Sequence, residues 1–173
     1  MITAQGVDAG ALTQGAALLS RPADEYENDT NVEAAWVVQA CQYADVHFNL
    51  ISSVDPKLLR LTAEDDRILD AFERAFPGAQ LECLTEESLK SPAAKPKWRE
   101  FLDANRDIPD YNYGTLLRLN SESDYNEENT TLVPRLQFLA IEISRNRKGL
   151  NDNVWKKSAL IRSQSLDKND CTS

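Results

Sequence analysis

The strongest hydrophobic pattern along the chain lies in Leu132–Lys148. Phe138 and Ile141 lie on one side of the helix that this segment predicts, and a helix that is apolar on two sides is usually buried. Pro134 suits the first turn and Gly149 suits the C-terminal cap. We therefore expect a central buried helix. Its main apolar face follows three- and four-residue spacing and comprises Leu132, Leu136, Leu139, Ala140 and Ile143.

A polar stripe formed by Arg135, Glu142 and Asn146 runs between the two apolar sides. Glu142 can meet Arg145 and Asn146 at helical spacing. Two interpretations stay open. Buried charges are normally paired, which favours an internal network that fixes how neighbouring helices pack. In the alternative, Arg135, Arg145 and Arg147 face a groove and bind an acidic partner.

Further apolar patterns predict helices earlier in the chain. Asn31 begins a long helix that runs to about Ser52, and a second helix ends near Phe76 before a Pro-Gly pair. A third helix turns Trp98 and Phe101 inward. The single histidine, His47, lies in the long helix and is read as a packing residue, because no nucleophile motif accompanies it.

The segment Asp110–Leu119 does not fit a helical pattern, and periodicity alone cannot decide between a short strand and a helical turn. The fold class that we predict is all-α, a single-domain array of helices around the buried C-terminal helix, with at most one short extended segment here. Its 173 residues suffice for one core. We expect a flexible tail over 1–20, the helical domain over 21–155 and a polar tail over 156–173.

Composition narrows the possible functions. The formal net charge of -9 argues against a nucleic-acid or anionic-membrane surface. Cys41, Cys83 and Cys171 are odd in number and widely spaced, which favours reduced thiols in the cytosol or nucleus over a disulfide framework. With one histidine we expect no metal site. No apolar run reaches membrane-spanning length, and no glycine-rich loop follows a strand, so we expect no membrane segment, no cofactor and no enzymatic activity.

Several irregular motifs together resemble one family. They read LISSVDPKLLRLTAEDD over Leu50–Asp66, DYNYGTLLRL over Asp110–Leu119 and VPRLQFLAIEISRNRKGLN over Val133–Asn151. In this order they are similar to the polysaccharide-biosynthesis-domain-containing (PBDC) family. The resemblance covers roughly Arg21 to Trp155.

The resemblance implies a compact array of helices and a cytoplasmic chaperone without enzymatic activity. Its client would be newly made elongation factor one-alpha, whose GTPase domain it would protect until that domain folds around nucleotide. The nascent polypeptide-associated complex and the ribosome would be further partners, and we expect a monomer. Two alternatives stay open: a carbohydrate-biosynthesis enzyme, methyltransferase-like, as the family name suggests, and a passive interaction scaffold.

A client-binding surface is expected where the two most distinctive motifs meet. Exposed tyrosines offer a large contact area at low entropic cost, and arginines supply charge partners. In the alternative, the tyrosines pack under the central helix and the arginines form internal salt bridges. The candidate client-binding residues are Tyr111, Asn112, Tyr113, Gly114, Arg118, Arg135, Arg145, Asn146 and Arg147.

Overall fold

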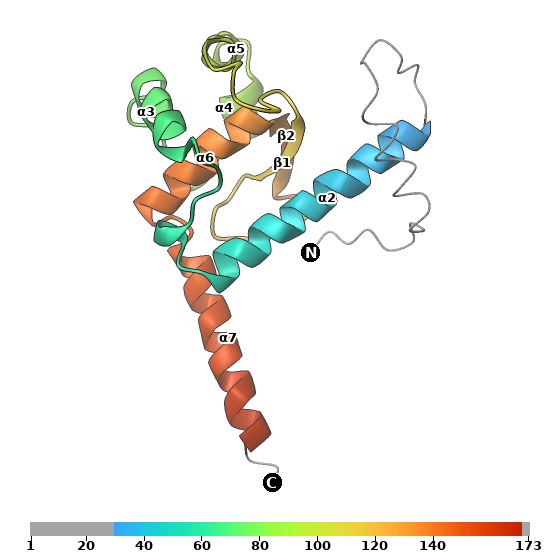
Figure 1. Cartoon of the computed structure of the whole chain (residues 1–173), viewed down its shortest axis with the longest axis vertical. Coiled ribbons are helices and arrows are strands. Elements are labelled where there is room, and N and C mark those ends of the chain that lie inside the picture. Colours follow the sequence, from blue (N-terminus) through green and yellow to red (C-terminus); the bar gives the residue numbers. More distant parts are fainter. Residues whose placement is uncertain (1–29, 171–173) are drawn as a thin grey trace.

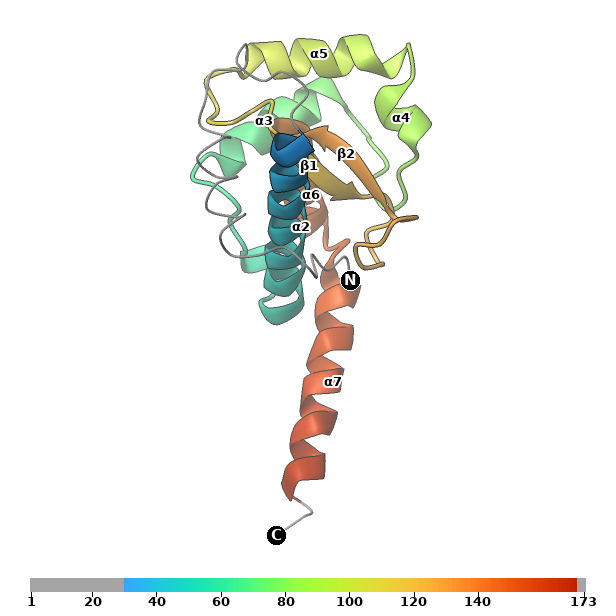
Figure 2. The ribbon, with the colours of Figure 1, turned by 90° about the vertical axis from the view of Figure 1, so that its right-hand side faces the viewer.

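The computed structural model describes residues 30–170. The tail expected over 1–20 lies outside the described residues, as do 21–29 and 171–173. Figures 1 and 2 show the described elements in two views at right angles. In chain order they are α2 (Thr30–Ser53), the 3-10 helix η2 (Pro56–Leu58), α3 (Asp65–Ala75), α4 (Glu86–Lys90), α5 (Ala94–Ala104), β1 (Gly114–Arg118), β2 (Thr130–Pro134), α6 (Arg135–Lys148) and α7 (Asp152–Asp170).

The expected all-α class is wrong, because β1 and β2 form a two-stranded antiparallel sheet. Gly114 pairs with Pro134 at one end and Arg118 with Thr130 at the other. The fold of the described chain is therefore α+β. The segment Asp110–Leu119, for which periodicity allowed either a short strand or a helical turn, contains the strand β1. Its partner β2 follows an acidic loop. A five-residue strand is too short for its alternation to stand out in the sequence, so pairing decides its conformation.

The sheet also shortens the predicted central helix, which begins at Arg135 rather than at Leu132. Leu132 and Pro134 belong to β2, and the Leu132 side chain is 44% exposed instead of facing the core. From Arg135 onward the prediction of a buried helix is confirmed, since every residue from Leu136 to Asn146 is buried. Figure 1 shows α6 between α3 and the sheet.

Both ends of α6 are satisfied by backbone groups. The Tyr113 carbonyl accepts from the Arg135 N–H at 2.7 Å, and the Tyr111 carbonyl accepts from the Leu136 N–H at 2.9 Å. At the other end Gly149 has φ 74°, the left-handed conformation that favours glycine, and its N–H donates to the carbonyls of the last turn. The first turn of a helix leaves N–H groups without helical partners, so the tyrosine-rich loop acts as the N-terminal cap of α6.

An aromatic cluster joins α3 and α5 over one side of α6. The rings of Phe76 and Trp98 stack with centroids 4.2 Å apart, and Phe72 stacks on Trp98 at 5.9 Å. Phe101 meets Trp98 edge-on. Stacked and edge-to-face pairs add to the stabilisation from burial alone, so this cluster anchors the two helices.

The two long helices, α2 and α7, pack against each other near the C-terminal end of α2, and α7 then projects away from the body (Figure 1). The segment 156–170, which we expected to belong to a polar tail, continues α7 as helix. Asp152–Asp170 contains neither glycine nor proline, so nothing in the sequence ends the helix earlier.

Candidate functional site

A fully buried ionic network holds the middle of α6. The Glu142 carboxylate accepts from the Arg118 guanidinium at 3.1 Å and 3.2 Å, and from Arg145 Nη1 at 2.8 Å. All three side chains are 0% exposed. Asn151 joins them by donating to Glu142 at 3.0 Å and to the Asn146 side-chain oxygen at 2.7 Å. The network ties β1 to α6 and to the start of α7.

Backbone carbonyls complete the network around the two arginines. Arg145 donates to the carbonyls of Leu81, Arg118 and Leu119, each at 2.8 Å. Arg118 donates to the carbonyl of Ser121 at 2.8 Å. Two buried guanidiniums face a single carboxylate, so these carbonyl dipoles are needed to satisfy the remaining donors.

Three predicted client-binding residues are thereby removed from the surface. Arg118, Arg145 and Asn146 lie inside the protein and cannot line an exposed groove, so the expectation is corrected for them. The alternative, in which arginines form internal salt bridges, holds for Arg118 and Arg145. The i,i+3 spacing of Glu142 and Arg145 indicated one of these contacts, whereas the Leu81, Arg118 and Leu119 carbonyls that Arg145 also binds come from segments far away in the sequence.

Burial and neighbouring charges together shift the pKa values of Glu142 and His47. Burial alone would raise the pKa of Glu142, but Arg118 and Arg145 outweigh it and hold that pKa well below its usual range. Burial lowers the pKa of His47 to about 4, against the opposing pull of Glu142. His47 Nε2 lies 3.6 Å from Glu142, yet the imidazole is neutral at neutral pH, so this contact is not an ion pair.

His47 connects the network to the side chains outside it. A hydrogen bond of 2.8 Å joins its Nδ1 to the hydroxyl of Tyr125. Burial raises the pKa of Tyr125, and the nearby Glu142 raises it further. Phe138 meets the imidazole edge-on at 5.1 Å. These contacts support the packing role expected for His47.

The predicted tyrosine loop mixes buried and accessible groups. Tyr111 is partly buried against the core, and Asn112 is exposed. The Tyr113 hydroxyl donates to the Gln39 side chain of α2 at 2.9 Å. A Cβ on Gly114 would lie 2.9 Å from the Trp36 ring, so only glycine lets β1 approach α2 this closely. The loop therefore holds α2 against the sheet.

Arg147 also has an internal role, although it is only partly buried. Its Nη1 donates to the carbonyls of Lys57 and Leu59, at 3.2 Å and 3.1 Å. These bonds fasten the connection after α2 to the last turn of α6. Arg147 therefore holds part of the fold together through these two backbone acceptors.

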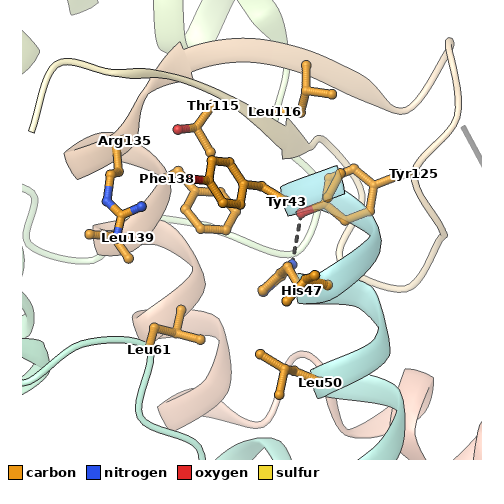
Figure 3. Close-up of a pocket in the computed structure, with 12 residues that line it drawn as sticks. Tyr43, His47, Leu50, Leu61, Thr115, Leu116, Tyr125, Arg135, Phe138 and Leu139 are labelled. Atoms are coloured by element: carbon orange, nitrogen blue, oxygen red, sulfur yellow. Dashed lines mark hydrogen bonds between the residues drawn. The ribbon is translucent and has the colours of Figure 1, made fainter. Parts of the chain in front are cut away.

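A groove between α2 and α6 gives the remaining candidate, Arg135, a distinct position (Figure 3). The groove has a volume of about 130 Å³. Thr115 and Leu116 lie toward one end of it and Leu50 and Leu61 toward the other (Figure 3). The central walls are Tyr43, Val46 and His47 from α2 and Phe138 and Leu139 from α6.

Arg135 lines this groove, and the side chains that the structure describes, over 33–164, offer it no partner. Among them its guanidinium has no hydrogen-bond acceptor and no ion pair, and its Nε is buried without a hydrogen bond. Figure 3 shows the guanidinium beside Leu139. A partly buried cation next to apolar walls gains free energy when an anion pairs with it, so this side chain is the best-placed binding group of the nine predicted.

The outer side of α2 extends the groove as an apolar stripe, which we define as Tyr43, Val46 and Leu50. Their side chains are 44%, 57% and 40% exposed. Tyr43 and Leu50 also fit the helical spacing of the residues that face the core, yet both are exposed in the structure. In the structure α2 packs through a narrower face that includes Ala40, Ala44 and Ile51. Apolar spacing alone could not separate the two faces.

The described residues offer little other chemistry. Across residues 30–170, no group of three or more His, Cys, Asp or Glu side chains is arranged to hold a metal ion. Within the same residues, no helix is both long enough and apolar enough to cross a membrane. Cys41 is buried and Cys83 exposed, and both are free thiols. The α2–α6 groove is the candidate site because Arg135 and the exposed apolar residues of α2 line it.

Comparison with known proteins places this fold in a family. Residues 32–156 match the model of the PBDC1 protein family. The chain belongs to the PBDC1 protein family. It is 48% identical over 159 residues to human protein PBDC1, a match that covers 90% of this chain and 68% of the human protein. A PBDC1 homolog of Saccharomyces cerevisiae is 40% identical over 135 residues, covering 75% of this chain and 92% of that protein.

A solved structure supports the same fold. The solution NMR structure of protein yst0336 from Saccharomyces cerevisiae superimposes with a TM-score of 0.70 at 38% sequence identity. The match covers 79% of this chain and 97% of that one. The PBDC1 match spans the elements that build the groove, from α2 to the start of α7.

Proposed function

We propose that this protein is a chaperone without enzymatic activity that assists the folding of newly made elongation factor one-alpha. The observation that carries the proposal is membership of the PBDC1 family across the whole helical core. The motifs that resemble the PBDC family imply this role, and they lie within the matched region.

The surface of α2 is compatible with such a role. A chaperone must offer accessible apolar area to a client that has not yet buried its own. Tyr43, Val46 and Leu50 remain exposed beside a groove, and Tyr is a frequent energetic anchor in protein interfaces. The net charge of -9 also favours a protein partner over a nucleic acid.

The proposal includes a place of action and further partners. The protein would work in the cytoplasm as a monomer, near the ribosome, with help from the nascent polypeptide-associated complex. It would bind the GTPase domain of the client and release it once the domain has folded around GTP. It would need no cofactor.

Capture of nascent chains tests the proposal. Elongation factor one-alpha is translated in a cell-free system with a tagged copy of this protein, and ribosome-bound chains are recovered through the tag. We expect enrichment once the GTPase domain has emerged, and loss of binding when GTP allows folding. A soluble enzyme of similar length that is not a GTPase serves as the control client.

Equal recovery of both clients would contradict the proposal and favour a passive scaffold. A calorimetric titration with S-adenosylmethionine and with nucleotide sugars addresses the enzymatic alternative. Stoichiometric binding of either compound would favour a carbohydrate-biosynthesis enzyme.

A further inference from the structure

The size of the α2–α6 groove limits what it can hold. Sites for cofactors and drug-sized ligands usually measure roughly 300–1,000 Å³. The groove measures about 130 Å³, close to the roughly 150 Å³ cavity that accepts a benzene-sized molecule. It therefore has room for one bulky apolar side chain, not for a nucleotide or a whole cofactor.

The charge of the groove further limits which ligands it can bind. Among the described residues that line it, Arg135 is the one that is charged at neutral pH, because His47 is neutral there. The Arg135 guanidinium has no partner among the side chains that the structure describes, those of 33–164. A guanidinium pairs best with a carboxylate or phosphate, and the pair is strengthened where apolar walls reduce the access of water.

The exposed apolar stripe on α2 also constrains what the groove binds, because it continues the apolar surface beyond the groove. Tyr43, Val46 and Leu50 recur at the three- and four-residue spacing of one helix face. An occupant that filled only the groove would leave this stripe in water. A polypeptide segment can cover the stripe and place one side chain in the groove at the same time.

We propose that the α2–α6 groove binds an apolar segment of the client protein, which inserts one bulky side chain between the helices and pairs a carboxylate with Arg135. The inference rests on the proposed chaperone function and adds the chemistry of the recognised segment. That segment is apolar and carries an Asp or Glu next to its anchoring side chain. Charge complementarity with Arg135 selects it from other apolar segments.

Photo-crosslinking identifies the segment. Benzoylphenylalanine is placed at position 46 of the full chain, which is irradiated with ribosome-bound elongation factor one-alpha, and the adduct is mapped by mass spectrometry. We expect a client peptide with large apolar residues and at least one carboxylate. The same probe at position 58, whose leucine is 78% exposed outside the groove, is the control.

Charge reversal then tests the role of Arg135. Arg135→Glu should weaken client capture about tenfold, the effect of roughly 1.4 kcal/mol. Arg74→Glu makes the same change at an exposed arginine on α3 and should leave capture unchanged. Replacing the crosslinked client carboxylate by Lys should restore capture by Arg135→Glu. Circular dichroism of each variant confirms that it is folded.

The outcomes separate the two proposals. If the unmodified protein captures no client, the proposed function fails. If it captures the client but Arg135→Glu and Arg74→Glu behave alike, the chaperone role stands and the groove inference is overturned. A mapped peptide that lacks Asp and Glu, or an adduct at position 58 alone, would also overturn it.

Discussion

Arg145 and Arg135 belong to the same helix and meet opposite surroundings. Arg145 is completely buried and donates four hydrogen bonds of 2.8 Å, to three carbonyls and to Glu142. Arg135 lies about three turns earlier on α6, in the lining of a groove, and finds no acceptor among the described side chains. One side chain organises the fold, and the other is available to a partner.

The difference teaches that the type of residue does not reveal its role in this helix. Both arginines lie in the same motif and were candidates for the same client surface. What separates them is whether the fold itself satisfies the guanidinium. The β1 end and the loop before α4 bring carbonyls to Arg145, whereas Arg135 is surrounded by apolar walls.

The largest effect is expected from breaking the buried network. Glu142→Gln removes the carboxylate and leaves two buried guanidiniums unpaired, which should cost roughly 3–5 kcal/mol of unfolding free energy. Asp107→Asn is the matched change in an exposed pair, the bidentate contact of Asp107 with Arg67. It should leave the midpoint of urea denaturation nearly unchanged, because exposed ion pairs contribute little to stability. Similar losses for both variants would contradict the structural role of the network.

A smaller effect is expected from shortening one apolar side chain inside α6 and one in β2, just before the helix begins. Ile143 is 1% exposed, so Ile143→Ala should cost roughly 2–5 kcal/mol. Leu132 fits the same helical pattern but lies half-exposed in β2, and Leu132→Ala should cost about 1 kcal/mol or less. Urea denaturation of both variants checks the difference, and equal losses would place α6 at the periphery.

The pH dependence of stability should report on His47. In the unfolded chain its pKa is near the ordinary 6.5, whereas in the folded protein it is about 4. Between these values the unfolded chain binds a proton that the folded protein does not, so the unfolding free energy falls as pH falls. We expect a loss of about 2 kcal/mol between roughly pH 6.5 and 4.5.

The variant His47→Gln separates this contribution from others. It should remove the fall in that pH range, while carboxylates such as Glu86 and Asp107, whose pKa values are lowered by their partners, act at lower pH. Denaturant titrations at several pH values measure the slope. An unchanged slope in His47→Gln would show that another group carries it.

Much of the helical architecture could be predicted from the sequence. The spacing of apolar residues from Asn31 to Ser52 predicted α2, and the pattern after Arg135 predicted the buried α6. The sheet could not be predicted, because Gly114–Arg118 becomes a strand only through pairing with Thr130–Pro134. Pairing between distant segments outweighs local periodicity. Because Thr130–Pro134 pairs with β1, α6 begins at Arg135 and not at the predicted Leu132.

The candidate site could be predicted only in part. Arg135 was among the expected residues, but so were Arg118 and Arg145. Arg118 pairs with the Glu142 side chain of α6, and Arg145 binds the Leu81 carbonyl, so both arginines depend on acceptors that are far away in the sequence. Tyr43 and Val46 were missed as groove residues because α2 is apolar over more of its circumference than it buries. Which apolar side of a helix remains exposed depends on its neighbours, and the sequence of one helix does not contain them.

One paired measurement tests the contrast between the two arginines most directly. Arg135→Gln and Arg145→Gln are each measured for unfolding free energy and for capture of ribosome-bound elongation factor one-alpha. We predict that Arg145→Gln loses at least about 3 kcal/mol. Arg135→Gln should stay within about 0.5 kcal/mol of the unmodified protein and yet weaken capture several-fold. Normal capture by Arg135→Gln, or a loss of stability equal to that of Arg145→Gln, would contradict the account.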